Sequence, residues 1–350
     1  MSGPPNSAHL PPDDAAPVLI HTARSAYNEI YVYQKGPHRY MTFRPEALAP
    51  RQSTIEVENP LHAVTPTSQA HLTGAAIHGN PRRVLVLGVG AGVVPLALRE
   101  AFPQASIDAV DIDAAVIAIG REWFGLSRSS GERLRLHAAD ARSFVRQAHA
   151  EGRRWDVIVH DAYDRDYIPA HLMTVEFFRE LCSVLDEGGL VTINSYAQGE
   201  LHARELSTYA VTFADMFQVL PGHLNRVVVA YPRAKPKDDI LFANLLGHAH
   251  ALRRVGIDAA AMAAQLRPIK VQFDEALVMT DDAMLSPELL TLRRSMLDLL
   301  GVTATATLPG ARVSACAEAV TPAASRTPPP TSSPCPPRPS GNPAAGSPPP

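Results

Sequence analysis

The residues with the clearest capacity for chemistry lie in an acidic, aromatic loop, Asp161-Ala162-Tyr163-Asp164, which follows a buried apolar stretch. An amine nucleophile has a pKa of about 10.4, so its free-base form costs roughly 4–5 kcal/mol at pH 7. A carboxylate beside the reacting carbon can bind the ammonium and accept its proton as attack begins. We therefore expect Asp161 to be the catalytic proton acceptor, and Tyr163 and Asp164 to bind a cationic substrate. These aspartates are also candidates for solvated loop charges or a helix cap, and Arg165 partly neutralises the loop.

A glycine turn after a predicted strand is the second chemical feature. Residues 84–92 read VLVLGVGAG, so glycines stand at Gly88, Gly90 and Gly92. A dinucleotide fingerprint, GxGxxG, needs glycine at position 93, which is Val93 here. The spacing GxGxG is that of adenosylmethionine-type sites, where the backbone must turn sharply and approach a ligand closely.

Two carboxylates at the ends of the next strands favour a nucleoside ligand for this turn. Asp111 closes the second strand, 23 residues after Gly88, where an acid can accept both ribose hydroxyls. Asp140 closes the third strand, at the position that faces the adenine amino group in this fold. Asp113 is better placed as the N-cap of the following helix. The sequence therefore predicts a site for S-adenosylmethionine or its decarboxylated form.

The elements that must hold these residues follow a strand–helix alternation from residue 82. We expect strands at 83–87, 106–110, 134–138, 156–160 and 190–194, with helices at 93–101, 114–123, 141–151, 174–185 and 202–216. Near-continuous apolar strands that alternate with helices indicate a parallel sheet covered on both faces. Residues 217–220 and 226–231 read as a hairpin, which makes the last strand antiparallel. We therefore predict an α/β fold with a class I methyltransferase-like Rossmann sheet, and we expect 236–300 to be helical.

The remaining segments divide the chain into four regions. Strand candidates at 29–33, 40–43 and 53–57 predict a small N-terminal β-sheet within residues 21–78, ahead of a transferase domain at 79–300. Residues 1–20 and 301–350 are expected to be disordered tails; the second holds 13 of the 32 prolines. The helices of 236–300 are also compatible with docking a second subunit, so a homodimer is possible.

Composition narrows the class of protein further. A net charge of −3 gives no argument for nucleic-acid or acidic-membrane partners, and the longest apolar run is too short to span a bilayer. With no secretory signal visible, we expect a cytoplasmic protein. The three cysteines have no metal-type spacing, and the histidines His62, His71, His160 and His202 form no ligand cluster. We expect no metal and no tightly bound cofactor, and we interpret these histidines as packing or surface residues.

The order of these motifs resembles the spermidine synthase (polyamine aminopropyltransferase) family, in its spermidine-synthase-like bacterial branch. The resemblance covers about residues 25–290. Its motifs are NPRRVLVLGVGAG (80–92), VDIDAAVIAIG (110–120), LHAADARSFV (136–145), the more specific WDVIVHDAYDRDYIPAHLMTVEFFREL (155–181), DEGGLVTINSY (186–196) and VMTDDAMLSPEL (278–289).

The resemblance implies aminopropyl transfer from decarboxylated S-adenosylmethionine to a polyamine such as putrescine, which leaves methylthioadenosine. It assigns Asp161 to the family's proton-accepting aspartate and Asp164 to its amine-binding aspartate. Gln52 stands at a cosubstrate-contacting position. The family's glycine loop carries an aspartate for the aminopropyl ammonium where this chain has Ala91. Two alternatives therefore stay open: a methyltransferase that uses intact S-adenosylmethionine, and a non-catalytic nucleoside-binding module.

Overall fold

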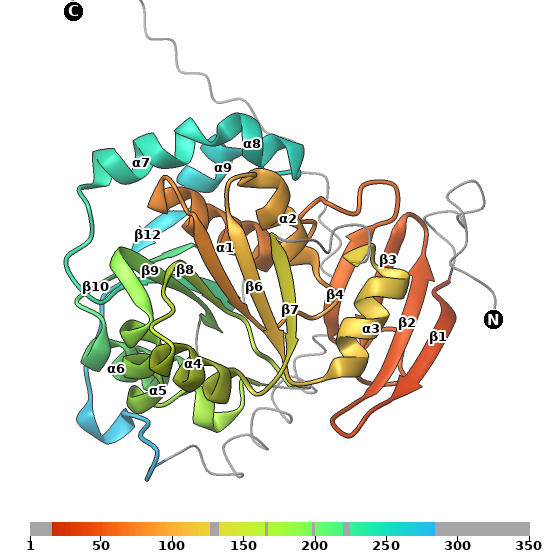
Figure 1. The fold of residues 1–350 in the computed structure, drawn as a ribbon, viewed down its shortest axis with the longest axis horizontal. Coiled ribbons are helices and arrows are strands. Elements are labelled where there is room, and N and C mark those ends of the chain that lie inside the picture. Colours follow the sequence, from red (N-terminus) through yellow and green to blue (C-terminus); the bar gives the residue numbers. More distant parts are fainter. Residues whose placement is uncertain (1–15, 127–132, 165–166, 198–199, 220–224, 284–350) are drawn as a thin grey trace, which may run out of the picture. The chain divides into compact units, whose positions relative to one another are not determined.

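The computed structural model describes residues 16–126, 133–164, 167–197, 200–219 and 225–283. Their main feature is an eight-stranded sheet with the strand order β12-β10-β11-β9-β8-β5-β6-β7 (Figure 1). Its strands are β5 (Arg83–Leu87), β6 (Ser106–Asp111), β7 (Leu134–Ala138), β8 (Trp155–His160), β9 (Leu185–Tyr196), β10 (Asp215–Val219), β11 (Asn225–Tyr231) and β12 (Leu266–Pro268).

Five of these strands, β5 to β9, run parallel, and the predicted hairpin supplies the antiparallel ones. Strand β11 pairs antiparallel with β9, and β10 pairs antiparallel with β11. The predicted fold class is thus confirmed. Because the carboxyl ends of β5, β6, β8 and β9 share one edge, the residues that follow them are brought together there.

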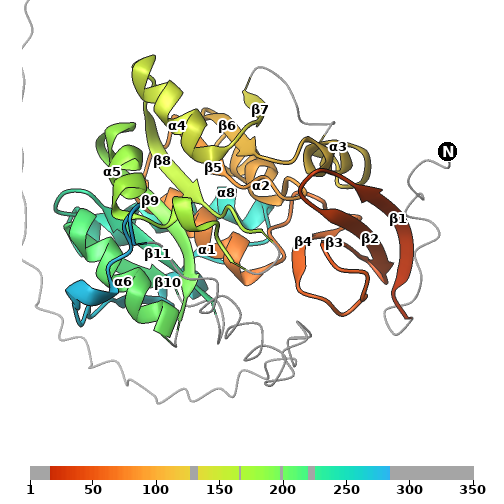
Figure 2. The ribbon, with the colours of Figure 1, turned by 90° about the horizontal axis from the view of Figure 1, so that it is seen from below.

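Helices cover both faces of this sheet, as Figures 1 and 2 show. One face packs against α1 (Pro66–His78), α2 (Val93–Ala101), α7 (Asp238–Gly247), α8 (Ala249–Arg254) and α9 (Ala259–Ala263). The other packs against α4 (Ala141–Ala150), α5 (Val175–Ser183) and α6 (Glu200–Thr212). Strand β5 serves both cores: Val84 and Val86 belong to the first, and Leu85 and Leu87 to the second. This alternation is the side-chain period of a strand buried on both faces.

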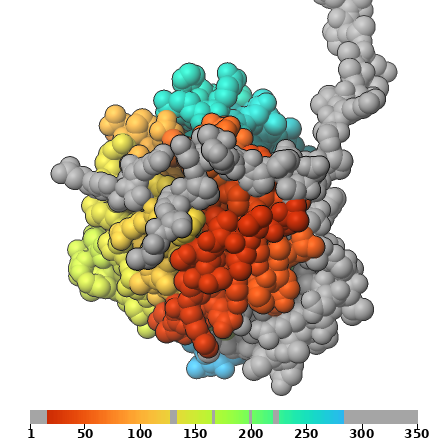
Figure 3. All heavy atoms as spheres, turned by 90° about the vertical axis from the view of Figure 1, so that its right-hand side faces the viewer, coloured from red at the N-terminus to blue at the C-terminus, as the bar shows by residue number. Residues whose placement is uncertain are grey.

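A four-stranded antiparallel sheet precedes this region, with β1 (Val18–Arg24), β2 (Glu29–Lys35), β3 (His38–Thr42) and β4 (Arg51–Glu56) in sequence order. Its buried residues pack against α3 (Ala114–Trp123) and the start of α2. Figure 3 shows the face that these strands present, in red and orange, and Val18 and Leu19 of β1 are exposed apolar residues. The sheet therefore brings β4 against the glycine turn of the larger sheet.

The structure differs from the sequence-based expectation at several places. Strand β1 includes residues 18–20, which were assigned to the N-terminal tail, and α1 was not expected; it packs on the larger sheet. The helical expectation for 236–300 holds for α7 to α9 but is wrong for 266–268, where a proline-ended segment adds β12 to the edge of β10. Residues 1–15 and 284–350, and with them the predicted C-terminal tail, lie outside the described residues.

None of the helices in the described part of the chain is long and apolar enough to cross a membrane.

Candidate active site

A cavity of about 590 Å³ opens at the carboxyl ends of β5, β6, β8 and β9 and is bordered by β4. This volume lies within the range of small-molecule sites. Of the residues predicted for the site, eight line it together: Gln52, Gly88, Gly90, Asp111, Asp140, Asp161, Tyr163 and Asp164. Residues from five separate segments of the sequence therefore meet at one place.

The turn requires glycine at positions 88 and 90, both because of its backbone conformation and because of its close neighbours. Gly88 has φ 93°, and a Cβ there would lie 2.1 Å from the carbonyl oxygen of Asp161. Gly90 has φ 52°, and a Cβ there would lie 2.6 Å from Oγ of Ser53. Because a side chain fits at neither position, the turn lies directly between the acidic loop and β4.

Gly92, which was also predicted to bind the cosubstrate, is not among the described residues that line the cavity. It is the N-cap of α2 with φ 93°, and a Cβ there would meet the side chain of Leu126 at 2.7 Å. Its requirement for glycine comes from this turn and this close packing.

Asp111 fixes the glycine turn from the neighbouring strand. Its Oδ2 accepts hydrogen bonds from the backbone amides of Val89 at 3.0 Å and Gly90 at 3.2 Å. Its Oδ1 accepts from the amide of Asp113 at 3.0 Å. Burial raises the pKa of Asp111. Asp113 caps α3 through the amide of Ala115, as predicted.

Asp140 is both a helix cap and a wall of the cavity. Its Oδ1 accepts from the amide of Ser143 at 2.8 Å, and its Oδ2 lies 2.9 Å from Nε2 of His171. Burial acts to raise the pKa of Asp140, but the hydrogen bonds from His171 and Ser143 outweigh it, so the pKa is lowered. His171 also lines the cavity and was not identified from the sequence.

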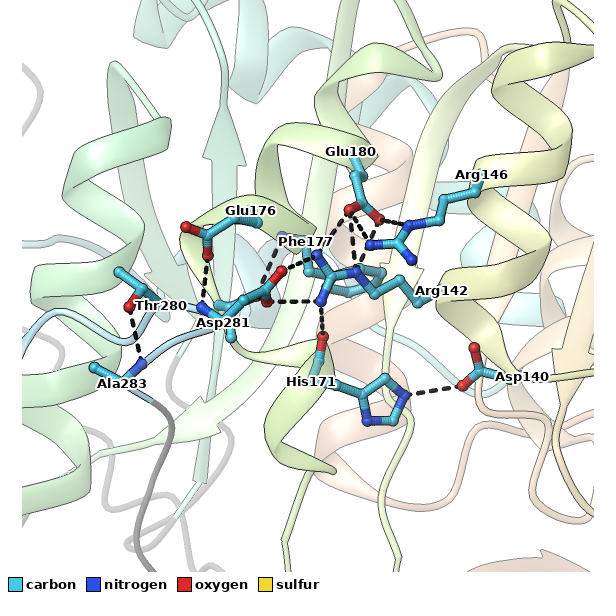
Figure 4. Close-up of polar contacts among 11 residues, drawn as sticks. Asp140, Arg142, Arg146, His171, Glu176, Phe177, Glu180, Thr280, Asp281 and Ala283 are labelled. Atoms are coloured by element: carbon cyan, nitrogen blue, oxygen red, sulfur yellow. Dashed lines mark hydrogen bonds and ion pairs between the residues drawn. The ribbon is translucent and has the colours of Figure 1, made fainter.

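A buried arginine holds His171 in place (Figure 4). Arg142 of α4 donates from Nη1 to the carbonyl of His171 at 3.1 Å. The same guanidinium forms paired hydrogen bonds with Glu180 of α5 and with Asp281. These hydrogen bonds connect the segment around Asp281 to α4. His171 continues the network, because its side chain contacts Asp140.

Asp161 directly follows β8, and its amide donates to the carbonyl of Leu87 at 2.9 Å. Its Oδ1 accepts from Nδ2 of Asn194 at 2.8 Å, and its Oδ2 lies 3.7 Å from Nε2 of His71. About a quarter of the side chain is exposed to the cavity, 26%. Burial raises the pKa of Asp161 to about 6, with the bond from Asn194 acting against it. A carboxylate with this pKa is ionised at neutral pH and is a stronger base than an ordinary aspartate.

The rest of the acidic loop lies at the mouth of the cavity. Asp164 is exposed, and its amide donates to the carbonyl of Tyr167 at 2.9 Å. The hydroxyl of Tyr167 donates to the fully buried Glu205 at 2.8 Å, which anchors the loop to α6. Arg165, which was expected to weaken the negative charge here, lies outside the described residues.

Strand β4 supplies Gln52 to the cavity, as predicted, and its neighbours define the other wall. Oγ of Ser53 accepts from the amide of Ala91 at 2.8 Å. Ala91 itself is fully buried with the residues of the smaller sheet. This position therefore offers the cavity no carboxylate.

The parallel sheet with its antiparallel hairpin and the cavity at the glycine turn together define a class I methyltransferase-like transferase domain. A model of the spermine/spermidine synthase domain matches residues 68–233. A polyamine aminopropyltransferase from Vibrio vulnificus (strain CMCP6) is 30% identical over 268 residues, which are 75% of this chain and 88% of that protein. The chain belongs to the spermine/spermidine synthase family, and the predicted resemblance is confirmed.

The chain is also similar to a methyltransferase in sequence and to a probable spermidine synthase in structure. A human eEF1A lysine and N-terminal methyltransferase is 27% identical over 210 residues, which are 53% of this chain but 29% of that longer protein. The crystal structure of a probable spermidine synthase from Corynebacterium glutamicum ATCC 13032 has a TM-score of 0.56 at 19% identity, covering 73% of this chain and 97% of that one. This structural likeness supports the fold.

Proposed function

We propose that this protein transfers an aminopropyl group from decarboxylated S-adenosylmethionine to an amine such as putrescine. Asp161 carries the proposal, because it is a carboxylate of raised pKa in a nucleoside-sized cavity. The amine nitrogen attacks the carbon beside the sulfonium, a C–N bond forms, and the C–S bond breaks with its electron pair going to sulfur. Asp161 takes the proton that the nitrogen loses, and methylthioadenosine leaves as a neutral product.

The nucleoside half of the cosubstrate would lie against the glycine turn. Gly88 and Gly90 allow its close approach, Asp111 accepts from the ribose hydroxyls, and Asp140 faces the adenine. Each carboxylate oxygen can accept more than one hydrogen bond, so Asp111 can bind the ribose while it holds the turn. Gln52 contacts the cosubstrate from the opposite wall.

The amine acceptor would enter past the acidic loop. Asp164 and Tyr163 line the cavity near its mouth, so a second ammonium of the substrate can pair with Asp164 while the first reaches Asp161. A homodimer and a cytoplasmic location are further predictions, which light scattering and cell fractionation would test.

Methyl transfer from intact S-adenosylmethionine is the second candidate, and Arg51 favours it. The Arg51 guanidinium lines the cavity and stacks 4.1 Å from the centre of the Tyr40 ring. Among the described residues it has no hydrogen-bond or ion-pair partner. An arginine in this position is suited to the carboxylate that decarboxylated S-adenosylmethionine lacks.

Calorimetry with the purified full chain separates the two candidates. We expect the decarboxylated form to bind more tightly than the intact form, and putrescine to yield methylthioadenosine from it. Binding of the intact form alone would overturn aminopropyl transfer, and binding of neither would overturn the nucleoside site. The variant Arg51→Gln is the control: it should weaken binding of the intact form only.

A further inference from the structure

His71 of α1 lies directly behind Asp161, although the sequence identified it as an ordinary packing residue. Its side chain is fully buried, and α1 approaches β9 so closely that a Cβ on Gly74 would lie 2.3 Å from Cγ2 of Thr192. This close approach places the His71 ring between Thr192 and Asp161. Its Nδ1 lies 2.8 Å from Oγ1 of Thr192, and its Nε2 lies 3.7 Å from Oδ2 of Asp161.

The hydrogen bond to Thr192 determines which ring nitrogen carries the proton. In the described part of the chain, Nδ1 of His71 is the acceptor available to the buried Thr192 hydroxyl. If the hydroxyl donates to Nδ1, that nitrogen is unprotonated and the ring proton sits on Nε2. Burial also lowers the pKa of His71 to about 3, so the ring is neutral. In this tautomer the N–H of a neutral imidazole points toward Asp161.

In the part of the chain that the structure describes, the Nε2 atom has no hydrogen-bond partner, and it is buried away from bulk water. The distance of 3.7 Å to Oδ2 is too long for a hydrogen bond, but contacts between catalytic groups shorten when substrate binds. The geometry points to His71 as a positioning residue for Asp161. It directs its Nε2–H at Oδ2 while Asn194 holds Oδ1, so the carboxylate is oriented from two sides. This role rests on the proposed proton transfer to Asp161.

A donor on Oδ2 stabilises the ionised carboxylate without adding a charge. Several other ionisable groups surround Asp161. Asp111, Asp140, Asp164 and His171 line the same cavity, and His160 precedes Asp161, with Nε2 bonded to the carbonyl of Leu172. The substitution of His71 leaves each of these side chains in the sequence, so an effect of His71 on Asp161 can be measured separately.

The test measures the pKa of Asp161 in the full chain without substrate, by carbon-13 NMR of labelled aspartate carboxyls. The Asp161 signal is the one that Asp161→Asn removes. Replacing His71 by leucine removes the donor, and we expect the Asp161 pKa to rise by about 0.5–1 unit. His71→Gln keeps a donor at the reach of Nε2 and should restore most of the wild-type value. Nitrogen-15 shifts should show His71 as the Nε2–H tautomer.

His78→Leu is the matched control, since it makes the same change at the far end of α1 and should leave the Asp161 pKa unchanged. An unchanged or lower Asp161 pKa in His71→Leu, or an Nδ1–H tautomer, would overturn the proposal. Where turnover is detected, the pH midpoint of kcat/KM should shift upward with the pKa, while a purely structural role would lower the melting temperature alone. If the wild type forms no methylthioadenosine, the proposed function fails, yet the titration still decides the role of His71.

Discussion

Asp108 lies in β6 and Asp161 directly follows β8, and both carboxylates have lost much of their contact with water. Their surroundings nevertheless shift their pKa values in opposite directions. Asp108, with 4% of its side chain exposed, receives two hydrogen bonds from Arg135, one from His137 and one from Trp155. Burial acts to raise its pKa, but these donors hold it well below the ordinary range. Among the described residues, the Asp161 carboxylate receives one hydrogen bond, from Asn194, and its pKa rises to about 6.

The difference shows that burial alone does not make a carboxylate reactive. What matters is whether donors and cations compensate for the lost water. At Asp108, hydrogen bonds from the protein replace the lost water, and the carboxylate links β6, β7 and β8. Asp161 is compensated only in part and opens onto a cavity, which suits a group that must take up a proton.

Removing the compensated carboxylate should have the largest effect on stability. Asp108→Ala leaves Trp155 Nε1 without its acceptor and Arg135 and His137 without their anion. We expect a loss of about 3–5 kcal/mol in the free energy of unfolding, measured by urea denaturation. Asp238→Ala, which removes an exposed ion pair with Lys235, should cost less than about 1 kcal/mol. Equal losses of stability in the two variants would mean that the buried hydrogen bonds of Asp108 contribute no more than an exposed ion pair.

Gly88→Ala should disturb Asp161 through its backbone. The new Cβ would need φ 93° and would meet the Asp161 carbonyl at 2.1 Å, so we expect a loss of about 2–5 kcal/mol together with reduced turnover. Gly152→Ala is the matched control, because it has φ 69° but nothing within 4 Å of the new Cβ. Its cost should be limited to about 1–2 kcal/mol of backbone strain. If Gly88→Ala lost no more stability than Gly152→Ala, the acidic loop would be able to move away from the new Cβ, and the account would be contradicted.

Asp161→Asn should stabilise the protein at neutral pH. The pKa of Asp161 is about 6 when folded and 3.8 when unfolded, so the folded state binds more protons between these values. Ionisation of Asp161 therefore lowers the free energy of unfolding. This loss is fully present above pH 6 and absent below pH 3.8. We expect a gain of roughly 1–3 kcal/mol at pH 7 that disappears on acidification, whereas the stabilisation from Asp108 is itself lost in acid. Destabilisation by Asp161→Asn at pH 7 would refute this account.

The smallest expected effect is on the wild-type enzyme itself, in the change of kcat/KM with pH. Because the base must be ionised, kcat/KM should fall about tenfold per pH unit below about 6 and reach a plateau above it. A steady-state profile in which the midpoint stays near 4 would mean that Asp161 is not titrating as the base.

The fold and the position of Asp161 could be predicted from the sequence, whereas the role of Asp108 was not predicted. The apolar strands and the glycine spacing predicted β5 to β9, and acids at strand ends predicted Asp111, Asp140 and Asp161, because parallel strands share a carboxyl edge. What could not be predicted were the partners, Asn194 and His171, since nothing in local sequence specifies which distant side chain meets a carboxylate.

Helix α1 was missed for a different reason. It is buried around most of its circumference, so it shows no amphipathic stripe. Its capping signals were nevertheless present: Thr65 accepts from the amide of Ser68, Pro66 occupies the first turn, and Gly79 ends the helix. Reading these signals would have placed His71 on a helix before the first parallel strand.

The most direct test compares wild type with Asp161→Asn in a single turnover of decarboxylated S-adenosylmethionine and putrescine. Asparagine keeps the shape and the Asn194 contact but cannot accept a proton. We predict that methylthioadenosine forms about 10²–10⁴-fold more slowly, while the affinity for the cosubstrate measured by calorimetry stays within a few-fold of wild type. An unchanged rate of methylthioadenosine formation in the variant would contradict the assignment of Asp161 as proton acceptor.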